Sequence, residues 1–280
     1  MSAEGPQPVG VADPATAWRL GVLGWPVAHS RSPAMQGAAL AELGLGHWSY
    51  GLLPVPPDAI EETIRALAGT GFAGANVTIP HKHAALAGAD VATPAAREIG
   101  AANTLSVRTD GTLEADNTDA PGLLDAIGEP LAGRTATVLG AGGSARACAW
   151  ALREAGCASV RVWNRTPERA RALAEDLAID AVEVVSPGDV LVQSTAVGLH
   201  DPGETFRALP LVASDLADHG MVVDMVYRPE GTALLEAAAR AGARTVDGLA
   251  ILVAQGARSL ERWTGRPAPR ATMDRAARAA

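Results

Sequence analysis

Hydrophobic and polar positions alternate along this chain with two different periods. Short apolar runs rich in Val, Leu and Ile are typical of buried strands, and the longer segments between them have the spacing of amphipathic helices. The first part of the chain is predicted to contain strands at 19–24, 47–53 and 74–79 and helices at 32–43 and 57–67. Strands that alternate with helices of this length indicate βαβ units on a mostly parallel sheet.

A predicted hairpin interrupts this series. The segments 103–108 and 112–117 read as two strands, and Thr109-Asp110-Gly111 joins them. Asp-Gly is a strong signal for a tight turn between strands. A helix predicted at 119–127 then leads to a second part of the chain.

The second part repeats the alternation of strands and helices. Its strands are predicted at 135–139, 159–164, 181–185, 190–195 and 221–227, followed by a short strand near Val246 and a helix at 247–265. The two series predict two α/β domains. We assign residues 1–118 to the first domain and 119–247 to the second, and we expect the helices of residues 248–280 to pack back on the first.

The glycines after strand 135–139 indicate what the second domain binds. The stretch TATVLGAGGSARA places Gly140, Gly142 and Ala145 in a G-x-G-x-x-A pattern between a strand and a helix. Gly140 permits a tight turn, Gly142 lets the backbone approach a pyrophosphate, and the helix N-terminus offers N–H groups to the anion. Such a pattern alone is often only a turn, but its position here predicts a Rossmann-like, doubly wound dinucleotide-binding domain.

The end of the next strand indicates which dinucleotide. An NAD-binding domain usually carries an acidic residue there for the ribose 2′-hydroxyl, whereas this chain has Asn164, Arg165 and Thr166, with Arg169 one turn later. Two guanidinium groups favour a 2′-phosphate and therefore NADP. Alternatively, Asn164 or Thr166 caps the following helix and the arginines are merely solvated. Capping of the helix and binding of a phosphate can also occur together.

Length, charge and cysteines narrow the class of protein. A chain of 280 residues is long enough for two domains, and its net charge of −8 argues against nucleic acid or an anionic membrane as partner. Cys148 and Cys157 fit neither a metal site nor a disulfide framework, which predicts a reducing cytoplasm. The first 17 residues have no signal-peptide pattern, and we interpret them as a tail.

Polar residues in the first domain and the terminal helix mark a second candidate site. Ser32 precedes Pro33 and reads as a helix N-cap, although Ser30 and Ser32 beside a helix N-terminus also suit a carboxylate. The stretch NVTIPHK places Thr78 and Lys82 at a strand end, where Lys82 is either a functional amine or a solvated lysine. Further candidates are Asn103, Asp119 and Gln255, and a buried Gln on an apolar helix needs partners.

Several motifs in one order resemble the shikimate dehydrogenase family. They span the chain from Gly21 to Gly265 and are GVLGWPVAHSRSP, NVTIPHK, GAANT, DNTD, LGAGGSARA, NRTPERA, DMVYRP and DGLAILVAQ…WTG. The resemblance implies NADP-linked reduction of 3-dehydroshikimate to shikimate in aromatic amino acid biosynthesis, on the chorismate pathway. It also implies two α/β domains flanking a cleft and, in many members, a homodimer.

The resemblance also implies roles for residues at matching positions. Lys82 and Asp119 are the expected catalytic pair. The expected substrate contacts are Ser30, Ser32, Thr78, Asn103, Asp119, Tyr227 and Gln255. The expected NADP contacts are Gly140, Ala141, Gly142, Gly143, Ser144, Ala145, Asn164, Arg165, Thr166, Arg169 and Gly248. No metal is expected, because His81 and His83 have no further ligands near them.

Some residues depart from the family pattern. Ala115 stands where the family usually has Gly, and Gln193, Leu199 and Ile251 change the expected surroundings of the nicotinamide. The nearest alternatives are a quinate/shikimate or an aminoshikimate dehydrogenase. More distant ones are a methylenetetrahydrofolate dehydrogenase, a glutamyl-tRNA reductase, which would need a cysteine in the first domain, and a non-enzymatic NADPH-binding protein.

Overall fold

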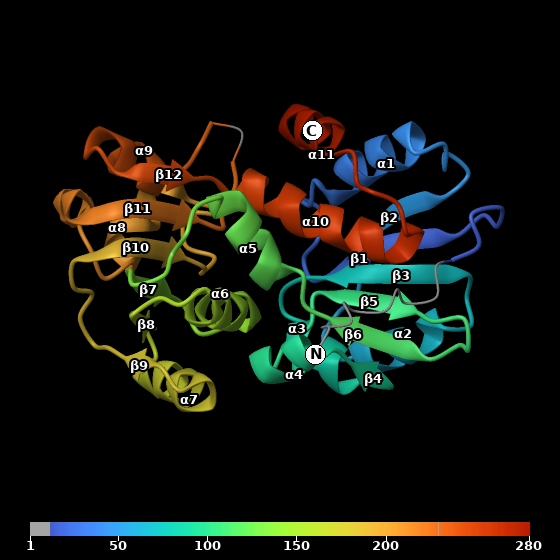
Figure 1. Ribbon diagram of the computed structural model, residues 1–280, viewed down its shortest axis with the longest axis horizontal. Helices are drawn as coiled ribbons and strands as arrows, with labels where there is room; N and C mark the ends of the chain where they lie inside the picture. Colours follow the sequence, from blue (N-terminus) through green and yellow to red (C-terminus); the bar gives the residue numbers. More distant parts are fainter. Residues whose placement is uncertain (1–11, 229) are drawn as a thin grey trace, which may run out of the picture. The chain divides into compact units, whose positions relative to one another are not determined.

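The computed structural model describes residues 12–228 and 230–280, which form two compact units (Figure 1). The first unit runs to Thr118 and resumes at Gln255, and the second comprises Asp119–Ala254. Each is built on a six-stranded sheet. The predicted α/β class is therefore confirmed. The second boundary falls inside helix α10 (Gly248–Thr264), at residue 255 and not at 248. Most of the predicted N-terminal tail lies outside the described residues.

The first unit contains a mixed sheet. Its strands are β1 (Arg19–Gly24), β2 (Ser49–Pro54), β3 (Phe72–Val77), β4 (Val91–Ala92), β5 (Thr104–Val107) and β6 (Leu113–Asp116). They lie in the order β2-β1-β3-β5-β6-β4, and β1 pairs in parallel with β2 and β3. The predicted hairpin is confirmed, because β5 and β6 are antiparallel and Gly111 has a positive φ of 85° in the turn.

Helices pack on this sheet through small and aliphatic side chains. The helices of the first unit are α1 (Ser32–Glu42), α2 (Ile60–Leu67), α3 (Lys82–Ala87), α4 (Pro94–Ile99), the second half of α10 and α11 (Arg270–Ala279). Ile64 of α2 and Ala85 of α3 share one hydrophobic cluster with Leu105 of β5. On α10, buried Trp263 donates from Nε1 to the Leu105 carbonyl at 3.0 Å, and Gly74 has no room for a Cβ beside it. The terminal helix therefore lies directly on the sheet.

The second unit has the strand order of a dinucleotide-binding fold. Its strands are β7 (Thr135–Leu139), β8 (Ser159–Trp163), β9 (Asp180–Ala181), β10 (Gly188–Gln193), β11 (His219–Asp224) and β12 (Arg244–Val246). All pairs are parallel, in the order β9-β8-β7-β10-β11-β12. Counted from β7 this is the doubly wound order 3-2-1-4-5-6, in which ligands bind beyond the carboxyl ends where the order reverses. That point lies between β7 and β10.

The helices of the second unit form two groups. They are α5 (Asp119–Ile127), α6 (Gly143–Glu154), α7 (Pro167–Leu177), α8 (Thr205–Ala208) and α9 (Ala233–Arg240), with 3-10 turns η1 (Pro202–Glu204) and η2 (Ala213–Asp218). Helix α6 contacts α5 and α7, whereas α9 contacts α8 and η2. Leu191 and Val222 of the sheet and Leu234 of α9 belong to one buried cluster. Right-handed crossovers before and after the reversal place such groups on opposite faces of the sheet.

Four local predictions were wrong. Strand 181–185 is reduced to Asp180–Ala181, at an edge where Val184 is 73% exposed and finds nothing to pack against. Strands 74–79 and 221–227 end earlier, at Val77 and Asp224, because the chain turns there. Ser32 is no N-cap, since α1 already begins at Ser32 and its capping position, residue 31, makes no side-chain capping bond.

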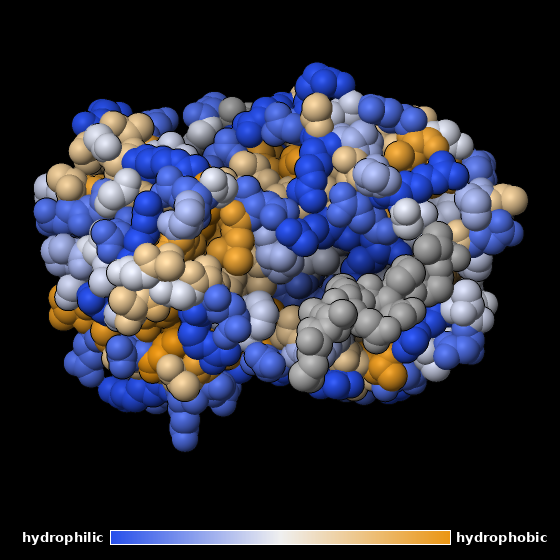
Figure 2. All heavy atoms as spheres, in the orientation of Figure 1, coloured by the Kyte–Doolittle hydropathy of each residue, from blue (hydrophilic) through white to orange (hydrophobic). Residues whose placement is uncertain are grey.

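The surface is mostly polar. On the face drawn in Figure 2, hydrophilic residues predominate and hydrophobic ones show in separate small areas. No helix within the described ranges is long and apolar enough to span a lipid bilayer. Cys148 is buried and Cys157 is partly buried, and the two form no disulfide within the described residues.

Candidate active site

Lys82 is held at the carboxyl edge of the first sheet. Beyond the end of β3, the Thr78 N–H donates to the Leu23 carbonyl at 2.8 Å, and the chain turns into α3, which begins at Lys82. The preceding residue, His81, is buried and its Nε2 lies 2.7 Å from the Val55 carbonyl, which anchors the start of the helix. Lys82 is only 7% exposed. A merely solvated lysine is therefore excluded at this position.

Main-chain bonds place Lys82 next to the predicted polar residues. The Lys82 carbonyl accepts from the N–H of Ala102 at 2.9 Å, and Asn103 follows. Asn103 is 2% exposed and donates from Nδ2 to Oε1 of Gln255 at 3.1 Å. The buried Gln255 therefore has the partner that the sequence predicts it needs. Asn103 Oδ1 accepts from the N–H of Thr118 at 2.7 Å, and Asp119 is the next residue.

Ser30 and Ser32 lie at the beginning of α1. Ser30 Oγ accepts from the N–H of Ser32 at 3.3 Å, so its own proton is available to a ligand. Ser32 is 4% exposed. Two hydroxyls beside a helix N-terminus suit the oxygens of a carboxylate.

Next to these residues lies a network of neutral polar groups, all buried except the half-buried Tyr50. Its members are Tyr50, Asn76, Thr104, Thr118 and Ser259. Ser259 Oγ lies 2.8 Å from Thr104 Oγ1 and 3.1 Å from Thr118 Oγ1, and Thr118 Oγ1 accepts from Asn103 Nδ2 at 3.0 Å. The sequence analysis assigned none of them a role, although Asn76, Thr104 and Thr118 lie inside its motifs.

The glycine turn of the second unit has the form that a dinucleotide requires. Gly140 has a positive φ of 122°, and its N–H donates to the Trp163 carbonyl at 2.8 Å. Gly142 occupies the N-cap position of α6, where no side chain makes a capping bond, and a Cβ added there would meet no protein atom within 4 Å. The backbone at Gly142 is thus open to a ligand, and Ala145 is fully buried. These features fit a bound pyrophosphate.

Two arginines at the end of β8 are available to an anion. Arg165 and Arg169 are exposed, and neither side chain has a hydrogen-bond or ion-pair partner within residues 12–228 and 230–280. Thr166 occupies the N-cap position of α7 but its side chain makes no capping bond. Asn164 donates from Nδ2 to the Thr166 carbonyl at 3.0 Å instead. A hydrogen bond within the loop therefore stabilises its conformation, and the guanidinium groups of Arg165 and Arg169 do not contribute to it.

Gly248 has a steric reason to be glycine. A Cβ at Gly248 would lie 2.7 Å from the Met225 carbonyl oxygen and 2.8 Å from that of Val226. The first residue of α10 thus packs directly against the main chain that leads to Tyr227. The predicted contacts of Gly248 and Tyr227 with ligands stay predictions.

Asp224, the last residue of β11, is a buried carboxyl group. It is 2% exposed, and burial raises its pKa to about 6, although hydrogen bonds from the Thr232 side chain and the Val226 N–H (3.0 Å) lower it in part. Thr232 Oγ1 also caps α9 by accepting from the N–H of Leu235 at 3.3 Å.

We expect Asp224→Asn to remove one source of pH-dependent stability. The folded protein keeps the Asp224 proton up to about pH 6, whereas the unfolded chain loses it near 3.8, so stability from this group is complete below 3.8 and is lost as the pH rises through 6. This loss amounts to about 2–3 kcal/mol in the wild type. Urea unfolding from about pH 4 to pH 8 measures it. An unchanged pH dependence in Asp224→Asn, relative to the exposed control Asp58→Asn, would contradict this expectation.

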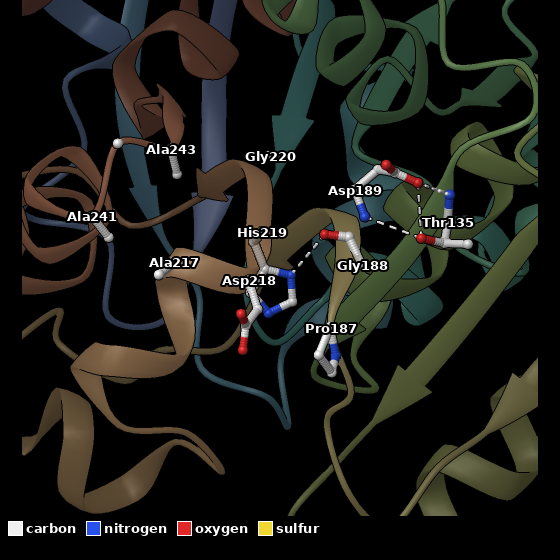
Figure 3. Close-up of a pocket in the computed structure, with 11 residues that line it drawn as sticks. Thr135, Pro187, Gly188, Asp189, Ala217, Asp218, His219, Gly220, Ala241 and Ala243 are labelled. Carbon is white, nitrogen blue, oxygen red and sulfur yellow. Dashed lines mark hydrogen bonds between the residues drawn. The ribbon is translucent and has the colours of Figure 1, made fainter.

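A hollow of about 580 Å³ opens at the amino-terminal edge of the second sheet (Figure 3). It is lined by the first residues of three strands, Thr135, Gly188 and His219, together with Asp189 and Asp218. His219 Nδ1 lies 3.2 Å from the Gly188 carbonyl, and burial lowers the pKa of His219. Because ligands of open α/β sheets bind at the carboxyl ends, we assign this hollow no part in the reaction.

No group of three His, Cys, Asp or Glu side chains in the described part of the chain is placed to hold a metal ion.

Comparison with known families matches three stretches of the chain. Residues 22–105 match "Shikimate dehydrogenase substrate binding domain", and residues 123–197 match "Shikimate / quinate 5-dehydrogenase". Residues 248–278 match "Shikimate 5'-dehydrogenase C-terminal domain". The three matches occur in chain order and include most residues of both candidate sites, whereas Asp119 and Tyr227 lie between the matched stretches.

Similar proteins cover nearly the whole chain. The shikimate dehydrogenase (NADP(+)) of one strain of Thermus thermophilus is 47% identical over 94% of this chain and 98% of its own. That of Methanothermobacter thermautotrophicus is 42% identical over 91% and 93%. Among solved structures, shikimate 5-dehydrogenase of another Thermus thermophilus strain in complex with NADP(H) and shikimate has a TM-score of 0.85 at 44% identity, covering 94% of this chain and 99% of that one.

Proposed function

Because the chain belongs to the shikimate dehydrogenase family, we propose that it catalyses the reversible NADPH-dependent reduction of 3-dehydroshikimate to shikimate. It is an NADP-dependent oxidoreductase. One observation carries the assignment of the active site. Lys82 is buried, and its carbonyl accepts a hydrogen bond from the residue that precedes Asn103, a member of a buried group of neutral hydrogen-bond donors and acceptors. A small acid with several hydroxyl groups needs such a set.

Substrate recognition rests on neutral groups and one anion site. We assign the substrate carboxylate to Ser30 and Ser32, and the ring hydroxyls to Thr78, Asn103 and Gln255. Buried polar groups reject an analogue that lacks a hydroxyl, because the unmatched group of the protein then stays unpaired. The bond between Asn103 and Gln255 supports this role, since it fixes the orientation of both amides. Tyr227 is assigned to the junction of substrate and nicotinamide.

Lys82 is the proposed proton donor. Reduction of a ketone places negative charge on its oxygen, and NADPH supplies the hydride when bound. A protonated Lys82 donates its proton from Nζ to that oxygen as the charge develops. Lys82 is the only lysine among the 23 basic residues of the chain. Arginine cannot give up a proton at neutral pH, so none of the arginines can replace Lys82 in this step.

Asp119 is the proposed partner of Lys82. Its carboxylate is 5% exposed, at the first residue of α5 and directly after Thr118, which is bonded to Asn103. A carboxylate in this role keeps an ammonium group charged and oriented, and accepts from a ring hydroxyl of the substrate.

The second unit holds the cofactor. The main chain of Gly140, Gly142 and the start of α6 is proposed to bind the pyrophosphate, and Arg165 and Arg169 the 2′-phosphate. Two observations support this placement: the open space at Gly142, and two guanidinium groups without a partner in the described part of the chain.

Initial rates with a panel of substrates test the proposal. Shikimate, quinate and aminoshikimate are each oxidised with NADP⁺ and with NAD⁺, and shikimate with NADP⁺ should give the highest kcat/KM. Faster oxidation of quinate or aminoshikimate would favour the neighbouring specificities of the family. The absence of oxidation throughout, with NADP⁺ still bound, would favour a non-enzymatic NADPH-binding protein.

We place this reaction in aromatic amino acid biosynthesis, on the route to chorismate, and the enzyme in the cytoplasm. Its two free thiols are compatible with a reducing compartment. A homodimer stays a prediction, which light scattering coupled to size-exclusion chromatography tests.

A further inference from the structure

We propose that Tyr50 is a positioning residue of the substrate site, whose hydroxyl anchors Asn76 and, through it, the hydrogen-bond network beneath Asn103 and Gln255. This inference rests on the proposed function, and it deepens it by naming what holds the substrate contacts in place. Tyr50 lies on the edge strand β2, outside every motif that the sequence analysis used.

The direction of the Tyr50 hydrogen bond follows from its partner. Asn76 Nδ2 lies 3.3 Å from the main-chain oxygen of Asn103, which can only accept, so the amide nitrogen must face it. Nδ2 also donates to Ser259 Oγ at 2.9 Å. Oδ1 of Asn76 therefore faces Tyr50, and the phenol donates to it at 2.8 Å. The single proton of Tyr50 is committed to Asn76.

This commitment keeps Tyr50 out of the chemistry of the site. With its proton given to Asn76, the phenol oxygen of Tyr50 can only accept a further hydrogen bond. Burial raises the pKa of Tyr50 far above its ordinary value, by more than the Ser32 side chain lowers it. The phenol thus stays neutral at working pH. Tyr50 fixes the position of Asn76 and takes no part in proton transfer.

The hydrogen bonds continue from Asn76 to the residues proposed to contact the hydroxyls of the substrate ring. From Asn76 they pass to Ser259, and from Ser259 to Thr118 at 3.1 Å. Thr118 Oγ1 and Gln255 Oε1 receive the two protons of the Asn103 amide, at 3.0 and 3.1 Å. Tyr50 and the proposed ring-hydroxyl contacts Asn103 and Gln255 therefore belong to one network of hydrogen bonds.

Tyr50→Phe removes the link while keeping the packing. The ring of Tyr50 lies against Trp263, with centroids 6.4 Å apart, and phenylalanine preserves this contact. The substitution leaves Asn76 Oδ1 buried without its donor and loosens the amide that holds Ser259. We expect the KM for shikimate to rise about 10-fold, which corresponds to about 1.4 kcal/mol. We expect kcat to change less than about threefold and the KM for NADP⁺ to stay unchanged.

A matched control separates positioning from a general loss of stability. Thr63→Val also removes one hydroxyl from the first unit, where Thr63 Oγ1 donates to the Ala59 carbonyl at 2.8 Å, and it should leave both KM values unchanged. Ser259→Ala should raise the KM for shikimate as Tyr50→Phe does. If both act through one network, the double variant shows less than the product of the single effects.

The outcomes are distinguishable from those of the proposed function. Wild-type activity is measured first, because its absence contradicts the proposed function. A KM for shikimate within twofold of wild type in an active Tyr50→Phe enzyme contradicts only the role of Tyr50. Equal losses for shikimate and NADP⁺, with a melting temperature lowered well below that of Thr63→Val, would also overturn it, because Tyr50 would then support the fold alone.

Discussion

Lys82→Ala is expected to lower kcat for shikimate oxidation by about 10²–10⁴-fold, with a smaller change in KM, as the loss of a general acid/base does. The side chain is buried at the start of α3, where His81 and the Ala102 N–H fix the main chain around it. No other lysine exists in the chain to replace it. Steady-state kinetics measure the effect, and NADP⁺ binding with thermal melting shows that the variant is folded.

Lys82→Arg distinguishes proton transfer from charge alone. Arginine keeps the positive charge but cannot release a proton at neutral pH, so Lys82→Arg should be nearly as inactive as Lys82→Ala. Asp119→Asn should lower kcat and weaken shikimate binding as well, and the double variant should be no worse than the worse single variant if the two residues act as one unit. Near-normal turnover in Lys82→Ala would remove Lys82 from the mechanism.

The double variant Arg165→Ala/Arg169→Ala is expected to weaken NADP⁺ binding by roughly 10–10³-fold and to leave NAD⁺ nearly unaffected. The 2′-phosphate is the only difference between the two cofactors. Hydrogen bonds from a guanidinium group to a phosphate contribute about 1.5–3 kcal/mol each, and less where solvent screens them, as it does at these exposed side chains. The KM for shikimate should not change.

Arg171 provides the matched control on the same helix. It is also exposed, but it pairs with Glu183 at 3.1 Å and Glu168 at 3.6 Å, so Arg171→Ala should not alter the cofactor preference. Measurements at low and high salt add a second check, because the contribution of exposed charges falls with ionic strength. Equal losses for NADP⁺ and NAD⁺ would mean that Arg165 and Arg169 support the fold and do not select the cofactor.

The fold could be predicted where local patterns agree with the tertiary structure. The strand, the glycine turn and the helix around Gly140 carry their own signal, as does the Asp-Gly turn at Gly111. The apolar run 181–185 has the composition of a strand, yet only Asp180–Ala181 pair, at the sheet edge. Pairing depends on a neighbour and on a surface to cover, and neither is visible in a short stretch of sequence.

The site could be predicted only as far as its residues lie in motifs. Lys82, Asn103 and Gln255 were found because each belongs to a recognisable stretch, and the structure brings Asn103 and Gln255 into contact across 152 positions of sequence. Tyr50 and Ser259 were missed because their bonds to Asn76 join residues 26 and 183 positions apart. A hydroxyl on an edge strand or on a terminal helix has no local signature that distinguishes it from a solvated one.

Because the only lysine of the chain is buried, proteolysis at that lysine can measure how often the structure around α3 opens. An endoproteinase specific for lysine has a single peptide bond to cut, between Lys82 and His83, inside the first turn of α3. That bond becomes accessible only when α3 detaches from the sheet, so the rate of appearance of two fragments measures this opening. A ligand that binds only the closed form slows the cut by the factor 1 + [L]/Kd. Gel electrophoresis can therefore measure substrate affinity in variants that keep Lys82 but turn over poorly, such as Asp119→Asn.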